Sequence, residues 1–471
     1  MRSLLLALSA FVSTAAYAQV IELPRMTMTE LAREPVPFVP PKLARDHDRD
    51  AIRQPRYMPS PFVLAIGAAT EATPKIAAPR IDTAFVDVVD PMRKYPADAA
   101  GAVGPHHVIG VTNDFVVIHD RAGKTLSSVF QEQFWSDTTS ALFDPRIAYD
   151  SVADRWVTVV LSDQNLNNAF LYLAVSATGD PMGAWRRFKI PANATNNQTY
   201  DLDFSRLALG GDRILVNAFL YNGDAGEGSE AFIVDAAAVY SADKPLALDR
   251  IISDEDIAPV TSTESAYFIS ESEQGFTLWR VNGTSLQNVA SPTSNVTAQP
   301  ILTGAQLGTS VTVPLSLPDF TSAYVSGGKL WAVQELGGVI VLNTYSLGAS
   351  TASTYVIADP AGKIAYAYPS MAVTPQGTML VAYAVFDAAA YISSQAVIVD
   401  ASGNVSAPVT IKNGEAAWTH ERWGDFTTTV LDPIDHTTFW TIQIYPTGST
   451  WATWWAHLAI AGGGRVRAVK H

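Results

Sequence analysis

Hydrophobic and polar positions alternate over short distances through most of the chain. After Ile81, brief runs rich in Val, Ile, Thr, Tyr and Trp are separated by Gly, Asn, Asp and Pro. This is the pattern of consecutive antiparallel strands joined by turns. No long amphipathic helical pattern competes with it, so the sequence predicts an all-β fold.

One phrase recurs along this region: a carboxylate or turn residue, a short strand holding a small residue, a turn, and a second apolar strand. Clear copies begin at or near Asp98, Asp144, Asp203, Asp319, Tyr368 and Asp425, and a degenerate copy begins at Glu264. The period is roughly 45 to 60 residues, the length of a four-stranded propeller blade. We predict a single β-propeller of about seven four-stranded blades, or six if the Glu264 copy is not a blade.

Two further features agree with a propeller. Small residues occupy equivalent points in the first strand of four repeats, where space around the axis is limited: Ala148, Ala208, Ala323 and Ala372. A propeller must also close its ring to protect strand edges. We expect the segment from Ile81, or the last strand from Thr453, to complete a blade with the opposite terminus.

The N-terminus predicts export. Residues 1–18 combine an early arginine, a short apolar stretch and the small-residue ending AYA, which is typical of a signal peptide. Residues 19–80 are rich in proline and charge and predict an extended leader or strap, followed by the propeller domain at residues 81–471. No later stretch has the roughly 20 apolar residues of a membrane helix. We expect a secreted or periplasmic monomer without membrane insertion.

Composition narrows the chemistry. The chain has no cysteine, which excludes disulfides and thiolate sites, and stability must come from an extensive core. Its net charge is -14, which argues against nucleic acid as a partner. The expected partner is a glycan or a cell-surface protein. No cofactor is expected, with calcium as the one alternative.

The candidate site follows from the predicted topology. Loops that enter the first strands of all blades lie on one face, so residues at the start of each phrase converge at the mouth of the central channel. The predicted ligand-binding set is Asp98, Asp144, Arg146, Asp203, Arg206, Asp319, Arg422 and Asp425. Carboxylates can serve in acid–base or nucleophilic steps on a glycosidic bond, or hold calcium, and arginines can bind anionic sugars.

Three functional hypotheses use this set. The first is a propeller that recognises a glycan or protein at the channel mouth, favoured by the absence of a complete catalytic motif. The second is a glycoside hydrolase or polysaccharide lyase, with candidate catalytic residues Asp203, Asp425, Glu421 and His420. The third is a calcium-stabilised structural module.

A structural explanation competes with each of them. An Asp before a strand commonly caps backbone N–H groups in a turn. In the polar segment HERWGDF, residues 420–426, the Arg422 and Asp425 pair could lock the final blade to its neighbour, with Trp423 packed between blades.

Several linked phrases resemble exported bacterial propeller proteins of unassigned activity, which are sialidase-like. These phrases are GAVGPHHVIGVTNDFVVIHDRAG, DPRIAYDSVADRWV, SATGDPMGAW and RWGDFTTTVLDPIDHTTFW. The resemblance runs from about Asp98 to the end of the chain and implies an extracytoplasmic propeller. The chain departs from sialidases because it lacks clear Asp boxes, HDRAGKTL from His119 being only a fragment of one. No catalytic residue is carried over.

Overall fold

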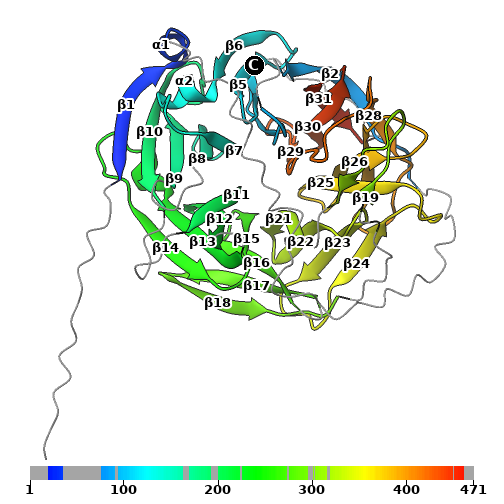
Figure 1. The fold of residues 1–471 in the computed structure, drawn as a ribbon. Coiled ribbons are helices and arrows are strands. Elements are labelled where there is room, and N and C mark those ends of the chain that lie inside the picture. The colour runs from blue at the N-terminus through cyan, green and yellow to red at the C-terminus, as the bar shows by residue number, and fades with distance from the viewer. Residues whose placement is uncertain are drawn as a thin grey trace, which may run out of the picture.

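The fold is an all-β propeller, seen along its axis in Figure 1. A computed structural model describes residues 20–34, 76–90, 94–162, 169–192, 200–222, 225–272, 275–294, 301, 303–315, 319–448 and 450–460. The predicted signal peptide and much of the predicted leader lie outside the described residues. No helix in the described ranges is long and apolar enough to cross a membrane.

Strands nearest the axis begin each antiparallel group. These are β3 (Ala100–Val103), β7 (Leu142–Asp150), β11 (Asp201–Gly210), β15 (Ala258–Ser262), β21 (Asp319–Ser326), β25 (Ala365–Val373) and β29 (Thr428–Leu431). Each contacts the next in this order, and β29 contacts β3. The first strands therefore close a ring.

The second and third strands follow by short turns. The second strands are β4 (His107–Val111), β8 (Arg155–Ser162), β12 (Arg213–Asn222), β16 (Tyr267–Ser272), β22 (Lys329–Glu335), β26 (Met379–Phe386) and β30 (Thr438–Thr447). The third strands are β5 (Phe115–Asp120), β9 (Phe170–Ser176), β13 (Ala225–Asp235), β17 (Gly275–Asn282), β23 (Ile340–Ser346), β27 (Ser393–Val399) and β31 (Thr450–Ala459).

The outer strands complete the groups. They are β6 (Thr125–Phe130), β10 (Ala184–Pro191), β14 (Leu248–Ser253), β18 (Ser285–Ala290), β24 (Ser353–Ile357), β28 (Val409–Lys412) and β2 (Arg80–Val89). Smaller elements are the strands β19 (Thr303–Gly304) and β20 (Val313–Pro314) and the helices α2 (Gln131–Trp135) and α3 (Ala236–Tyr240).

The number of blades stays a prediction. Parallel pairing of β11 with β15, and of β15 with β21, joins this region into one twelve-stranded sheet that is not divided into blades. The phrase from Glu264 was expected to begin with the first strand of a blade, but it begins with the second strand of its group. It forms β16 and β17, and the first strand of its group is β15, which the strand pattern alone does not distinguish from a second strand.

Ring closure follows the prediction. The N-terminal strand β2 pairs antiparallel with the last strand β31, so both ends of the chain build one sheet. Asp87 of β2 also reaches the neighbouring sheet, where His119 Nε2 lies 2.9 Å from its Oδ1. Thr453 donates to the other oxygen at 2.9 Å. Gly110 makes room for this carboxylate, because a Cβ there would lie 2.4 Å from both oxygens.

The core lies between neighbouring sheets, as the alternation of side chains along each strand requires. The predicted small residues do lie in first strands β7, β11, β21 and β25. Buried tryptophans pack together in the cluster at the closing sheet, namely Trp418, Trp423, Trp440, Trp451 and Trp455. These layers hold the first strands rigidly, which fixes the loops at their starts.

Part of the predicted leader packs on the rim. Strand β1 (Ile21–Thr27) pairs antiparallel with β10 as a fifth strand, and the one-turn helix α1 (Met28–Leu31) follows. Figure 1 shows β1 on the outside of its sheet, away from the axis.

Candidate functional site

Four of the predicted carboxyl groups gather where the first strands begin. One oxygen from each of Asp98, Asp144 and Asp425 lies within 4.8 Å of the others. The charge of Asp203 acts on both Asp98 and Asp144. The predicted convergence is therefore present for these four residues, which we call the axial group. Asp319 begins β21, but its side chain lies outside what the structure describes.

Local backbone geometry positions the axial group. Asp98 and Asp144 have φ of 45° and 53°, and Phe204 has φ of 56° in the next first strand. Asp tolerates the left-handed region better than most residues. The register of β7 on β8 shifts between Phe143 and Arg146, at the same place as the left-handed residue. A bulge of this kind re-aims side chains at the rim of a sheet.

The phrase alignment was off by one residue in the third repeat. The register shift in β11 lies between Asp203 and Arg206, so Arg206 matches Arg146. Phe204, with its left-handed backbone, therefore takes the place that Asp144 has in β7. Both strands carry the same bulge, and the offset arises because the carboxylate of the third repeat, Asp203, stands one residue earlier, at the position of Phe143.

The same carboxyl groups also join neighbouring sheets. Asp144 Oδ2 accepts a hydrogen bond from the backbone N–H of Phe204 at 2.6 Å, and Asp98 Oδ1 accepts one from Asp425 at 2.8 Å. Glu335 and Tyr368 repeat this arrangement at 2.6 Å. These carboxylates thus have a structural role, but the N–H groups that they accept from belong to a neighbouring sheet and not to their own turn, and this role does not account for the crowding of charge.

Burial and crowding raise two pKa values. Burial raises the pKa of Asp98, which Arg422 and the hydrogen bonds from Asp425 and Asn113 partly oppose. Burial raises the pKa of Asp144 well above its usual range, and the charges of Asp203, Asp98 and Asp425 add to this. A hydrogen bond between the carboxyl groups of Asp144 and Asp203 acts in the same direction, which is the behaviour of a pair that shares a proton.

The three predicted arginines have different partners. Arg206 forms two hydrogen bonds with Asp256, at 2.7 and 3.0 Å. Arg422 binds Asp425 at 3.1 Å, as predicted, but both belong to one loop. The Asp425 backbone N–H joins this loop to Asp98 at the start of β3, and a role of the ion pair in locking two blades stays a prediction. Trp423 is buried, as expected.

Arg146 differs from the other two. Its Nε donates to Ser205 O at 2.8 Å, and its guanidinium lies 3.4 Å from the ring centroid of Phe426. Its terminal nitrogens make no hydrogen bond to any described residue. Burial lowers the pKa of Arg146 to about 9, although Asp144, Asp98 and Asp425 favour its charged form. Arg146 thus places a partly buried cation and two donor nitrogens beside the axial group.

His420 and Glu421 precede Arg422 in the same loop, and the contacts of His420 are aromatic. His420 stacks on Tyr95 with ring centroids 4.3 Å apart and meets the edge of Trp418 at 4.8 Å. Glu421 is exposed. Their catalytic roles stay predictions, as do those of Asp203 and Asp425.

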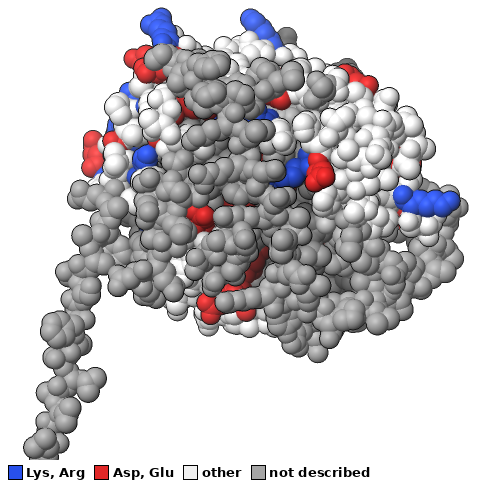
Figure 2. Space-filling model, in the orientation of Figure 1, with Lys and Arg blue, Asp and Glu red and all other residues white. Residues whose placement is uncertain are grey.

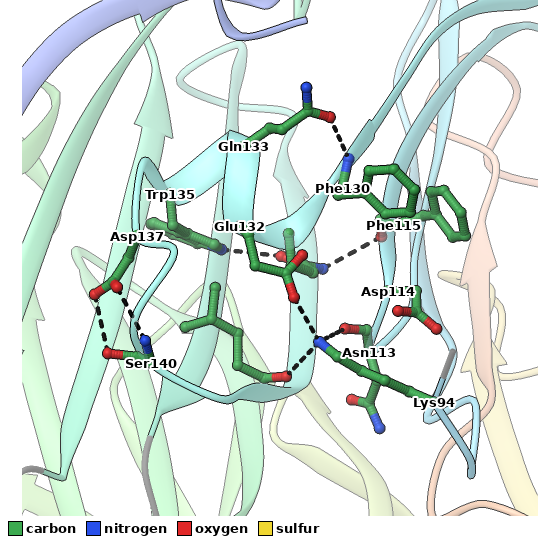
Figure 3. Close-up of polar contacts among 12 residues, drawn as sticks. Lys94, Asn113, Asp114, Phe115, Phe130, Glu132, Gln133, Trp135, Asp137 and Ser140 are labelled. Carbon is green, nitrogen blue, oxygen red and sulfur yellow. Dashed lines mark hydrogen bonds and ion pairs between the residues drawn. The ribbon is translucent and has the colours of Figure 1, made fainter. Parts of the chain in front are cut away.

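Sequence reasoning missed Asn113 and the lysine behind it. Asn113 donates to Asp98 Oδ2 at 2.6 Å and accepts from the Asp144 N–H at 2.8 Å. Figure 3 shows Lys94 beside it, where the ammonium donates to Asn113 O at 2.8 Å and to Glu132 Oε1 at 3.1 Å. A polar residue at or just after the end of the second strand was the available signal, since Glu335 ends β22 in the same way.

Charge outside the axial group is dispersed. Figure 2 shows acidic and basic side chains singly or in small groups over the described part of this face. The described surface in this view therefore offers no broad field of one sign for a polyanion.

Comparisons with known proteins concern the fold. No family model and no curated protein matches the chain. Similar solved structures include the α-L-arabinofuranosidase Arb93A of Fusarium graminearum with an iminosugar inhibitor, at 12% identity over 68% of this chain and 93% of that chain, with TM-score 0.38. The Dos1 propeller has 8% identity over 82% and 81%, with TM-score 0.40. YjhT has 9% identity over 78% and 95%, with TM-score 0.36.

Proposed function

We propose that this chain is an exported propeller that binds a glycan at the axial group. Saccharide sites combine charged groups, which bind hydroxyls through several hydrogen bonds, with apolar ring faces that exclude water. The axial group supplies carboxyl groups and Arg146, and the Phe426 and Phe204 rings lie beside them with centroids 4.5 Å apart. Asp98 and Asp144 are nearly fully buried, whereas Asp425 and Arg422 are partly exposed.

The observation that carries the proposal is Arg146. Its ring contact and its Ser205 bond hold the guanidinium, while the two terminal nitrogens have no partner among the described residues. The terminal N–H groups of a structural arginine normally donate hydrogen bonds to carboxylates or carbonyls, as those of Arg206 do to Asp256. A fixed guanidinium with open donors suits a ligand with adjacent oxygen atoms.

A glycan array tests this function. The wild-type mature protein is expected to retain a defined set of glycans, and Arg146→Gln to lose them. Arg280→Gln is the matched control, because Arg280 is exposed on β17 and its guanidinium donates a hydrogen bond to Gln287. Equal retention by wild type and Arg146→Gln would refute the assignment, as would an absence of any retained glycan.

A glycoside hydrolase is the second candidate, and the raised pKa of Asp144 favours it. A carboxyl group with a raised pKa holds its proton to higher pH than usual and can protonate a leaving oxygen, while an ionised neighbour acts as base or nucleophile. Product release from a polysaccharide panel, lost in Asp144→Asn and in Asp425→Asn, would establish an enzyme. Retention of a glycan without any product would leave recognition as the function.

A further inference from the structure

A second recognition surface lies on the outer rim, where residues 20–34 pack against the propeller. We call these residues the N-terminal segment. The surface beneath it consists of β10, helix α2 and the chain that follows α3, and we call it the rim site. The rim site takes its parts from three consecutive sheets and is separate from the axial group.

Main-chain pairing places the segment in one register. Ile21 lies opposite Lys189, Leu23 opposite Arg187, and the register shifts before Met26. Pro24 lies within the shift, where its missing N–H costs no ladder bond. The segment thus covers the edge of β10, which would otherwise present unpaired backbone groups.

Two adjacent arginines of β10 bind the segment from opposite faces, because successive side chains of a strand alternate. Arg186 donates to both oxygens of Glu22, at 2.8 and 3.0 Å. Arg187 donates to Pro24 O at 2.7 Å and is fully buried. Burial lowers the pKa of Arg187 to about 10, so its burial beneath the segment is costly unless these carbonyl contacts form.

The segment then turns inward through helix α1. Thr27 and Glu30 form a reciprocal capping box at its start. Met28 and Leu31 are completely buried, in one cluster with Trp185 of β10 and with Phe134 and Trp135 of α2. Two further bonds contact the segment: Gln133 donates to Glu34 O at its end at 2.7 Å, and Arg25 within β1 donates to Ala242 O at 2.7 Å.

We infer that the rim site is a peptide-binding site and that its ligand is the chain's own N-terminal segment. The ligand is recognised as an extended strand with one carboxylate, followed by a capped helical turn that presents two apolar side chains. This combination is strand addition supplemented by side-chain pockets, a known mode of peptide recognition. The contacts are noncovalent and come from side chains of several sheets, so they hold the segment independently of its covalent connection.

The test cuts that connection in the full-length chain. A protease recognition sequence is introduced within residues 35–75, and the folded protein is cleaved and passed over a size-exclusion column. The N-terminal piece is expected to co-elute with the propeller and to exchange with a fluorescent synthetic peptide of residues 20–34. Release of the piece on cleavage at micromolar protein, or equal binding of a scrambled peptide, would overturn the inference.

Peptide variants test the recognition chemistry without altering the propeller. Glu22→Gln in the peptide is expected to weaken binding roughly three- to tenfold, since its ion pair is partly exposed. Met28→Ala is expected to weaken it by about 30-fold or more, as a core truncation does. Thr29→Ala, at an exposed position of α1 whose side chain makes no hydrogen bond to a described residue, is the matched control and should change binding least.

The oligomeric state tests the source of the ligand. Uncut protein is expected to run as a monomer that does not take up the fluorescent peptide, because its own segment fills the site. A dimer in which two copies exchange their segments would contradict the assignment to the same chain. Unhindered uptake by uncut protein would contradict occupancy by the segment.

Discussion

Replacing Asp144 by Asn separates the electrostatic role of this residue from its structural role. The amide keeps an oxygen that can accept the Phe204 N–H, so the link between β7 and β11 is retained. It removes a carboxyl group that is crowded against Asp98 and Asp425. The variant should therefore lose function while the propeller remains folded.

The expected stability change depends on pH, and its sign follows from the raised pKa. Because the folded protein holds the Asp144 proton more tightly than the unfolded chain, this contribution to stability is complete below the unfolded pKa, near 4. It is lost as pH rises through the folded pKa. Wild-type stability should thus fall with rising pH relative to Asp144→Asn.

The magnitude follows from the separation of the carboxylates. Two charges 4.8 Å apart repel by about 3 kcal/mol at an effective dielectric constant near 20. The substitution also weakens the hydrogen bond from the Phe204 N–H, because its acceptor becomes neutral, and this offsets about 1 kcal/mol of the relieved repulsion. The variant should therefore gain about 2 kcal/mol above the folded pKa, or a few degrees in Tm.

Thermal melts of wild type and Asp144→Asn at pH 4, 6, 8 and 9 measure this difference. The Tm of the variant minus that of wild type should be close to zero or negative at pH 4 and should rise steadily with pH. A variant that is less stable than wild type at every pH would refute the reasoning and would make Asp144 a purely structural latch.

Three other perturbations test separate parts of the structure. Hydrogen bonds from Tyr172, Thr139 and Lys189 outweigh burial and hold the pKa of Asp137 well below its usual range, so Asp137→Asn should cost about 2 kcal/mol in urea unfolding at pH 7 and progressively less as pH falls below 4. Gly110→Ala should destabilise ring closure by about 1 to 3 kcal/mol, because the new Cβ meets the Asp87 carboxylate; an unchanged urea midpoint would show that Asp87 can move aside. Calcium bound by Asp98, Asp144 and Asp425 would raise Tm and lose that effect in Asp98→Asn, whereas a Tm that neither calcium nor chelator changes removes the calcium hypothesis.

The sequence predicted the architecture because each strand carries its own signal. Period-two alternation and turn residues identify strands locally, and the recurring phrase places Ala208 and Ala372 in first strands. Closure was also predictable, since an unpaired edge near Ile81 and another near Thr453 need partners. The Glu264 phrase failed because alternation alone does not distinguish a first strand from a second strand.

The candidate site was predicted as a neighbourhood and not as a set of contacts. Convergence of Asp98, Asp144 and Asp425 follows from topology, which the repeat reveals. Phe204 and not Asp203 takes the position of Asp144, because Asp203 stands one residue earlier relative to a bulge that both strands share, and the hydrophobic pattern does not reveal that bulge. Asn113 acts on both carboxyl groups through the folded loops, so only the three-dimensional structure shows its partners.

The most direct test of glycan binding at the axial group is isothermal titration of an array-identified glycan against wild type, Arg146→Gln and Arg280→Gln. The account predicts that Arg146→Gln binds at least about tenfold more weakly, as loss of a charged hydrogen bond implies, while Arg280→Gln matches wild type. Equal Kd values for Arg146→Gln and wild type would contradict it and would place any glycan site elsewhere on the propeller.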